Sequence, residues 1–255
     1  MSITQQNTEG YAMLKEIEEK KPFDCRQDAI WTYYQNERAE DFQGAEPRMA
    51  YIINTIRRQQ RNSDICLLNI GAGNGNFEKM AAAKGWNIYS IDPDEKTVNR
   101  LKSIGIKAVK AHIEKIVFEN NKFDFVVASE VLEHLSVEQC NLGIAEVKRV
   151  LKPGGWFIGT VPHRENLHQN IVFCPYCNST FHRWGHMRSF ELKTLATYLS
   201  RFFHNVHVKR TAFVTLRGNG MRGLIKGFVR IVLAKMGEEI AVPSILFLAR
   251  KEIQR

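Results

Sequence analysis

The stretch that decides the fold runs from Leu67 to Phe77 and reads Leu-Leu-Asn-Ile-Gly-Ala-Gly-Asn-Gly-Asn-Phe. An apolar run enters a turn with glycine at every second position, and a helix is expected to follow. Glycines let the backbone turn sharply and approach a ligand, while a helix N-terminus offers free N–H groups to a polar or anionic group. The stretch therefore predicts a strand, a ligand-binding turn and a helix.

An acidic residue ends the next apolar run, Ile88–Asp92. Asp92 lies 21 residues after Gly71, a position from which a carboxylate can accept hydrogen bonds from both ribose hydroxyls of a nucleotide-like cofactor. The spacing alone does not distinguish a nicotinamide cofactor from S-adenosylmethionine.

The rest of the chain alternates between apolar and amphipathic segments. We expect strands at Ile65–Ile70, Asn87–Ile91, Phe123–Ala128, Trp156–Val161, Val206–Phe213 and Ser244–Ala249. We expect helices at Asn76–Lys84, Glu95–Ile104, Val137–Leu151 and Ser189–Phe203. Strands that alternate with helices indicate βαβ units and therefore a doubly wound α/β fold with a mostly parallel sheet.

Three motifs in this order resemble the class I S-adenosylmethionine-dependent methyltransferases. They are the tight glycine turn Gly71–Gly75, the segment Phe123–Leu135 and the turn Leu151–Gly155 with the strand Trp156–Thr160 after it. The resemblance implies a Rossmann-like sheet of seven strands, a methyltransferase activity and S-adenosylmethionine as the cofactor.

The resemblance also implies the cofactor-binding residues. They are Asn69, Gly71, Ala72, Gly73, Gly75, Asp92, Pro93, His112, Ile113 and Ser129. The family usually has Asp at the position of Asn69 and often has Asp near His112. Because Asn69 carries no charge to attract the cofactor's amino group, we expect weaker cofactor binding.

Candidate catalytic residues follow the fourth expected strand. His134 is the candidate general base, with Glu130 and Glu133 beside it. The pattern Glu130-x-x-Glu133-His134 is similar to one that binds a divalent metal in some quinone-pathway members of the family. The alternative is that these residues only begin a helix.

A second candidate metal site contains Cys174, Cys177, His182 and His186, with the spacing C-x2-C-x4-H-x3-H. Four such ligands can close tetrahedrally on zinc. Two other interpretations stay open: a reduced Cys-x-x-Cys turn with histidines that line the acceptor pocket, and a redox-active cysteine pair.

The segment Cys174–Phe190 resembles an insert in methyltransferases of bacterial surface-glycan pathways. That resemblance implies O-methylation of a small polar acceptor such as a sugar or glycan intermediate carried on phosphate or lipid. The alternatives are a quinone-like precursor or RNA as the acceptor, or a catalytically silent cofactor-binding or scaffold protein.

The net charge of +9 is concentrated near the end of the sequence. Residues 201–255 contain 11 Lys and Arg against 3 Asp and Glu, which gives +8. The segment Gly220–Met236 combines apolar residues at helical spacing with a basic face. Such a helix can lie on an anionic membrane, hold a phosphate or pack on the core with its basic side in solvent; nucleic acid is a less favoured partner because no RNA-binding module accompanies it.

Composition and targeting signals favour a cytoplasmic protein. Met1–Lys20 has no apolar core of a secretory signal, and no apolar run approaches the roughly 20 residues that span a bilayer. We divide the chain into an N-terminal helical lid (1–62), an α/β core (63–165), a Cys/His insert (166–188) and a C-terminal part with the basic helix (189–255).

Overall fold

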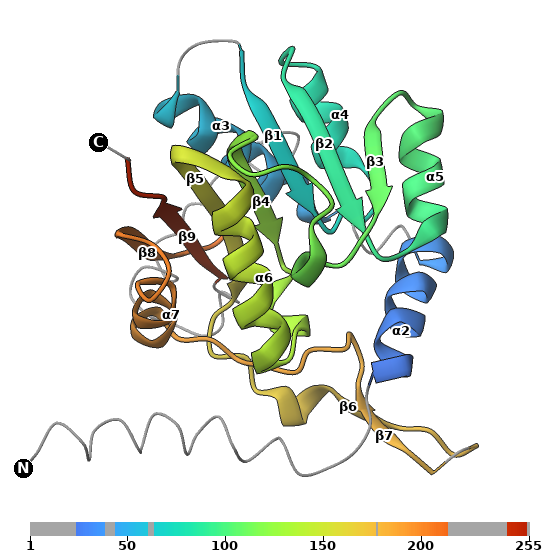
Figure 1. Ribbon diagram of the computed structural model, residues 1–255. Helices are drawn as coiled ribbons and strands as arrows, with labels where there is room; N and C mark the ends of the chain where they lie inside the picture. Colours follow the sequence, from blue (N-terminus) through green and yellow to red (C-terminus); the bar gives the residue numbers. More distant parts are fainter. Residues whose placement is uncertain (1–23, 39–43, 61–63, 177, 214–243, 254–255) are drawn as a thin grey trace, which may run out of the picture.

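The computed structural model describes residues 24–38, 44–60, 64–176, 178–213 and 244–253. The expected basic helix Gly220–Met236 and the candidate ligand Cys177 therefore lie outside the described residues. The main sheet has the strand order β3-β2-β1-β4-β5-β9-β8, in which β9 is antiparallel to both of its neighbours (Figure 1). The predicted seven-stranded, mostly parallel sheet is confirmed.

The strands lie close to their predicted positions. They are β1 (Cys66–Ile70), β2 (Asn87–Asp92), β3 (Lys107–Lys110), β4 (Phe123–Ser129), β5 (Leu151–Pro162), β8 (Asn205–Thr211) and β9 (Ser244–Arg250). Strand β3 was not predicted as a range, because four residues at the edge of the sheet with lysine at both ends carry little apolar pattern.

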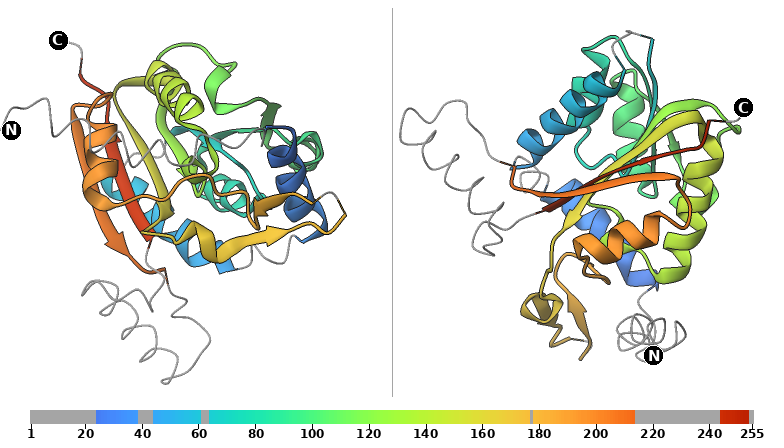
Figure 2. Two further views of the ribbon diagram at one scale, coloured as in Figure 1. Left: turned by 90° about the horizontal axis from the view of Figure 1, so that it is seen from below. Right: turned by 90° about the vertical axis from the view of Figure 1, so that its left-hand side faces the viewer.

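The helices form layers on both faces of the sheet. They are α2 (Asp24–Glu37), α3 (Glu46–Gln59), α4 (Asn76–Ala82), α5 (Glu95–Ser103), α6 (Val137–Val150) and α7 (Leu192–Leu199). Buried side chains of α3, α4 and α5 share one core cluster, and those of α6 and α7 share the other. Figure 2 shows α3 and α6 on opposite sides of the sheet.

Successive residues of each strand point into different clusters, as strand geometry requires. Leu67 packs into the cluster with α3, and Leu68 packs into the cluster with α6. The same alternation relates Ile158 to Phe157 in β5. The sheet is therefore covered by apolar side chains on both faces.

Helix α3 belongs to the core. Pro47 occupies its first turn, where a missing N–H has no cost, and Ile52, Ile53 and Ile56 are fully or almost fully buried. Helix α2 is more polar and lies beyond the carboxyl ends of β1, β2 and β4, near the hairpin of β6 (Ile171–Phe173) and β7 (Thr180–His182) (Figure 1). Helix α2 lies over the carboxyl-end edge of the sheet, and α3 reaches the same edge with its first turn, where Arg48 donates to Ser129.

Among the described residues, no helix combines the length and the apolar character that a membrane crossing requires.

Candidate active site

A cavity of about 1280 Å³ lies at the carboxyl ends of the parallel strands. Its walls come from the loops after β1 to β5, from α2, from the first turn of α3 and from the segment after β7. Sites for a single small molecule usually have volumes of about 300–1,000 Å³. The cavity is therefore large enough for a nucleoside-type cofactor together with a small acceptor. All predicted cofactor residues line it except Gly75.

The glycine turn needs glycine at its first position. Gly71 has φ +77°, and a Cβ atom there would approach Val131 Cγ2 to 2.9 Å. Its N–H donates to the carbonyl of Ile91 at 3.0 Å, which ties the turn to β2. Gly75 has φ +79° and caps α4, so its role is to start the helix rather than to line the cavity.

Asp92 is fully buried at the end of β2. Its Oδ2 accepts the N–H of Ala72 at 2.8 Å, and its Oδ1 accepts the N–H of Asp94 at 2.9 Å. Burial raises the pKa of Asp92 to about 6, although these backbone hydrogen bonds oppose the rise. The carboxylate is therefore anchored where the sequence predicted a ribose-binding acceptor.

Helix α2 contacts this cofactor edge through polar side chains that the sequence analysis did not identify. Gln35 Nε2 donates to Asp92 Oδ2 at 3.5 Å, and Gln35 Oε1 accepts the hydroxyl of Thr97 at 2.7 Å. Thr32 donates to Asp94 Oδ1 at 3.1 Å. The helix has little amphipathic pattern, so its sequence gave no signal for these contacts.

A second carboxylate lies beneath the glycine turn. Glu78 on α4 is fully buried, and its Oε1 accepts hydrogen bonds from Asn69 Nδ2 at 2.6 Å and Ser90 Oγ at 2.7 Å. Burial raises its pKa. The acidic group that Asn69 lacks is thus present next to Asn69, on a different element. Its sequence signal was a lone acidic residue in the first turn of α4.

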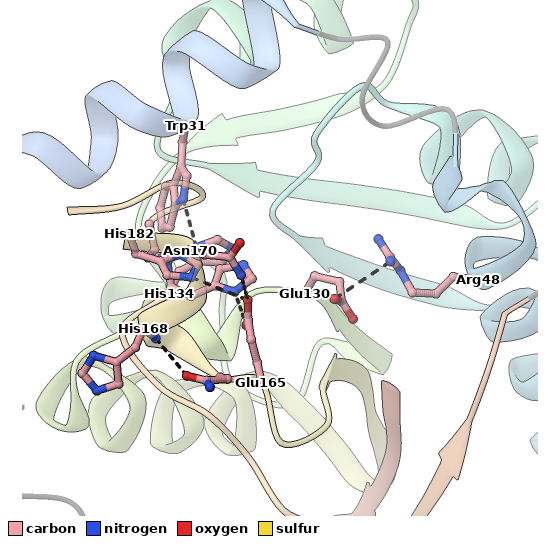
Figure 3. Close-up of polar contacts among 11 residues, drawn as sticks. Trp31, Arg48, Glu130, His134, Glu165, His168, Asn170 and His182 are labelled. Atoms are coloured by element: carbon pink, nitrogen blue, oxygen red, sulfur yellow. Dashed lines mark hydrogen bonds and ion pairs between the residues drawn. The ribbon is translucent and has the colours of Figure 1, made fainter. Parts of the chain in front are cut away.

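The loop after β4 carries Ser129 and Glu130. Arg48 Nε donates to Ser129 Oγ at 3.0 Å, and Ser129 Oγ lies 2.9 Å from Thr160 Oγ1. Arg48 also forms an ion pair with Glu130 at 4.0 Å (Figure 3). Glu130 has φ +56°, a left-handed conformation that is unfavourable for a residue with a Cβ atom. A strained acidic residue on the cavity wall is typical of a functional position.

The other two candidate catalytic residues belong to the short 3₁₀ helix η3 (Leu132–His134). His134 lines the cavity. Glu133 is fully buried, and neither of its oxygens has a hydrogen-bond partner among the described residues. Burial, with the nearby negative charge of Glu130 second, raises the pKa of Glu133 well above its ordinary value.

His134 contacts α2 and the segment after β7. The indole N–H of Trp31 donates to His134 Nδ1 at 3.2 Å, and the carbonyl oxygen of Gly185 lies 3.3 Å from the same nitrogen (Figure 3). The two contacts require opposite tautomers, because Nδ1 accepts in the first and donates in the second. Burial, with His186 as the next cause, lowers the pKa of His134 to about 3, so the ring is neutral near pH 7.

The predicted four-residue zinc site needs a correction for the part that the structure describes. Cys174, His182 and His186 do not gather their ligand atoms in one place. In the hairpin, Phe173 pairs with Thr180, whereas His182 pairs with Ile171. Cys174 therefore lies toward the tip and His182 at the base, about 10 Å apart along the strands at roughly 3.3 Å per residue. The sequence spacing did not reveal this extended hairpin.

The two histidines instead lie beside Glu165, for which no role was predicted. Figure 3 shows His182 and Asn170 near Glu165. His186 Nδ1 lies 2.5 Å from Glu165 Oε2, and His182 Nε2 lies 3.6 Å from Glu165 Oε1. Asn170 Nδ2 donates to the same Oε1 at 3.3 Å. His182 Nδ1 accepts the backbone N–H of His186 at 3.0 Å. Burial lowers the pKa of His182 to about 4, with nearby His186 adding to the effect.

Known proteins resemble the α/β core of this chain in sequence and in fold. Residues 68–159 match the protein family described as "Methyltransferase domain". The crystal structure of 1,6-didemethyltoxoflavin-N1-methyltransferase from Burkholderia thailandensis, with bound 1,6-didemethyltoxoflavin and S-adenosylhomocysteine, has the same fold. It has a TM-score of 0.64 at 16% sequence identity and covers 91% of each chain. Residues 68–159 are therefore similar to a methyltransferase domain, and the chain has the fold of a methyltransferase that binds S-adenosylhomocysteine.

Curated relatives resemble the methyltransferase domain over part of their length. A ubiquinone biosynthesis O-methyltransferase of Rickettsia bellii is 29% identical over 123 residues, which are 45% of this chain and 50% of that protein. An uncharacterised protein of Methanocaldococcus jannaschii is 27% identical over 139 residues, which are 54% of this chain and 57% of that protein. The chain thus spans about half the length of these relatives.

Proposed function

We propose that the protein transfers the methyl group of S-adenosylmethionine to an oxygen atom of a small polar acceptor. The observation that carries this proposal is the single cavity that continues from the glycine turn and Asp92 to His134 and His186. In-line methyl transfer depends mainly on the positions of donor and acceptor. A continuous cavity with a cofactor end and a second end allows both molecules to be held at once.

The second end favours an acceptor with many hydrogen-bonding groups. Polar side chains that line the cavity include Arg183, Asn166, Gln169 and Arg164, which also forms an ion pair with Glu191 at 3.1 Å. Guanidinium groups bind phosphate and carboxylate through paired hydrogen bonds, and amides bind hydroxyls. This lining supports a sugar or glycan intermediate carried on phosphate as the acceptor. We also propose, from the sequence alone, that the basic segment Gly220–Met236 contacts a lipid-linked acceptor.

A quinone-like precursor is the second candidate acceptor. It is favoured by the curated relatives named ubiquinone biosynthesis O-methyltransferase and by the pattern Glu130-x-x-Glu133-His134. Arg183, which lines the cavity, favours the first candidate, because its guanidinium group can bind a phosphate, whereas a neutral aromatic ring offers no anion to it. The two candidates differ in the fraction of a cell extract that would become labelled.

The experiment incubates the full-length protein with methyl-labelled S-adenosylmethionine and a fractionated cell extract. Label in the sugar-nucleotide or lipid-linked glycan fraction is the expected result, and label in the quinone fraction would support the second candidate. Label confined to RNA or protein would contradict a small acceptor. The absence of label from all fractions would favour a silent cofactor-binding protein.

His134 and Glu130 stay the candidate residues for contacts with the acceptor, since both line the cavity. A general base contributes roughly 10²–10⁴-fold to such a reaction. If His134 accepts the proton, its replacement by Gln lowers turnover by about 100-fold or more while S-adenosylhomocysteine affinity is kept. Near-normal turnover of His134→Gln would remove it from the chemistry.

A further inference from the structure

His186, in the segment after β7, has one ring nitrogen that is held by the protein and one that is not. Its side chain is 11% exposed and lines the cavity. Nδ1 lies 2.5 Å from Glu165 Oε2, whereas Nε2 has no hydrogen-bond partner among the residues that the structure describes. A ring nitrogen on the wall of a cavity, with no protein partner, can take a hydrogen bond from a ligand.

Glu165 is arranged as a hydrogen-bond acceptor. Asn170, the last residue of the short helix η4 (Leu167–Asn170), donates from Nδ2 to Glu165 Oε1 at 3.3 Å (Figure 3). His182 Nε2 lies 3.6 Å from the same oxygen. His182 Nδ1 accepts the backbone N–H of His186 at 3.0 Å, so the neutral ring of His182 carries its proton on Nε2. Donors therefore face Glu165 Oε1.

This arrangement decides which nitrogen of His186 carries a proton. A carboxylate has only acceptor oxygens, so the nitrogen that faces Glu165 Oε2 donates, and the proton lies on His186 Nδ1. The bond made by one ring nitrogen sets the tautomer of the whole ring. His186 Nε2 then has a free lone pair that can accept a proton.

The same contacts argue against a metal ion between Glu165, His182 and His186, whose ligand atoms lie within 4.8 Å of one another. An ion there would need a lone pair on His182 Nε2, and this nitrogen carries the ring proton because Nδ1 is the acceptor. His182 instead stacks on His186, with ring centroids 4.8 Å apart and planes at 18°. The stacking helps to fix the plane of the His186 ring.

The neighbouring rings favour a positive charge on His186 rather than on themselves. Burial lowers the pKa of His134 to about 3 and that of His182 to about 4, so both rings are neutral near pH 7. A proton on His186 would therefore meet the carboxylate of Glu165 and no charged ring on either side. The low pKa also makes His134 a weak proton acceptor.

We propose that His186 is the general base of the reaction and that Glu165 is the positioning residue that orients its ring and stabilises its charged form. This inference rests on the proposed function. A carboxylate that accepts the second N–H of a catalytic histidine has both of these effects in hydrolases that use a histidine base. His182 and Asn170 keep Glu165 in place, and His134 is left to contacts with the acceptor.

The proton and the electrons balance in this step. The O–H bond of the acceptor breaks, its proton moves to His186 Nε2, and its oxygen forms a bond to the methyl carbon that S-adenosylmethionine supplies. The bond between that carbon and sulfur breaks, and its electron pair stays on sulfur. His186 then returns the proton to water before the next turnover.

The first measurement needs no acceptor. In full-length protein with ¹⁵N-labelled histidine, NMR near pH 7 should show a low-field N–H signal whose nitrogen is Nδ1 of His186. The signal should be absent from His186→Gln and shifted upfield in Glu165→Gln, because an amide oxygen is a weaker acceptor than a carboxylate. A His186 ring protonated on Nε2 instead would overturn the proposal.

The second measurement is the rate of label transfer from methyl-labelled S-adenosylmethionine into the fraction of cell extract that the unaltered protein labels, with EDTA present. We expect His186→Gln to lower the rate by about 100-fold or more. Glu165→Gln should lower it by about tenfold or more, because its amide can still hold Nδ1–H but carries no charge. His168→Gln is the matched control, since His168 is exposed and does not line the cavity, and it should keep the normal rate.

Folding of each variant is checked by thermal unfolding and by its affinity for S-adenosylhomocysteine, which should equal that of the unaltered protein. A normal rate for His186→Gln would remove this inference and leave the proposed function intact. Activity that stops in EDTA and returns with Zn²⁺ would also overturn it, because His186 would then act as a metal ligand. No label transfer by the unaltered protein would contradict the proposed function itself.

Discussion

The carboxyl group of Asp92 has a pKa of about 6 in the cofactor-free protein, chiefly because it is buried. Only its ionised form presents two acceptor oxygens to ribose hydroxyls. We therefore expect the Kd for S-adenosylhomocysteine to be constant above about pH 7 and to rise about tenfold per pH unit below pH 6. Calorimetry between pH 5 and pH 8 measures this profile.

The pH affects the folding stability of the cofactor-free protein in the opposite direction to its affinity for the cofactor. A carboxyl group whose pKa is higher in the folded protein than in the unfolded chain makes folding less favourable as the pH rises from 3.8 to about 6. Cofactor binding at neutral pH offsets this loss. Asp92→Asn is the control. Its Kd for S-adenosylhomocysteine should be higher than that of the unaltered protein but nearly independent of pH. A pH profile like that of the unaltered protein would assign the titration to another group.

The backbone conformation of Glu130 lowers the stability of the folded protein, and we expect its side chain to be needed for activity. Its φ of +56° is unfavourable for any residue with a Cβ atom, and Gly adopts it without strain. We expect Glu130→Gly to raise the free energy of unfolding by about 1 kcal/mol and to lower methyl transfer. Denaturant unfolding measures the first effect. A destabilised variant would show that the ion pair with Arg48 outweighs the backbone strain.

Site residues that directly follow a strand could be predicted from the sequence, whereas those that other elements bring to the site could not. Asp92 and His134 could be predicted, because each follows an apolar strand at a recognisable spacing. Asn69 indicated a lost charge, whereas Glu78 supplies a carboxylate from the next helix. Gln35 was missed because its contact with Asp92 joins residues 57 positions apart.

At the scale of elements, α3 stabilises the core rather than only covering the site. Ile53 is 3% exposed and packs in the cluster of α4 and α5. We expect Ile53→Ala to lower the free energy of unfolding by about 2–5 kcal/mol, because it leaves a cavity. The neighbouring exposed residue supplies the control: Asn54→Ala should change stability by less than about 0.5 kcal/mol. Equal effects of the two changes would place α3 outside the core.

The hairpin of β6 and β7 shows why a ligand spacing alone is weak evidence. The interval between Cys174 and His182 fits a compact knuckle and also fits an extended hairpin. In the described part of the chain the backbone pairs in the second way, with Cys174 N–H bonded to the Ser179 carbonyl at 2.8 Å. Strand register, which the sequence did not specify, separates the cysteine from the histidines.

At the scale of the whole molecule, the sheet could be predicted because its strands are apolar and local in sequence. His134 and His186, which line the cavity, were candidates from the sequence, but the contacts that join α2, η3 and the segment after β7 around them could not be predicted. Trp31 and His134 are 103 residues apart, and His134 and Gly185 are 51 residues apart. Contacts at such separations depend on the completed fold.

We propose that the chain binds S-adenosylmethionine through Asp92. The measurement that tests it most directly is calorimetry of S-adenosylhomocysteine with the full-length protein and with Asp92→Asn at pH 7.5. We expect one site, and an affinity lower by about 1.5–3 kcal/mol in the variant, because hydrogen bonds to a charged acceptor are lost. An absence of binding to the unaltered protein, or an equal affinity for the variant, would contradict the account.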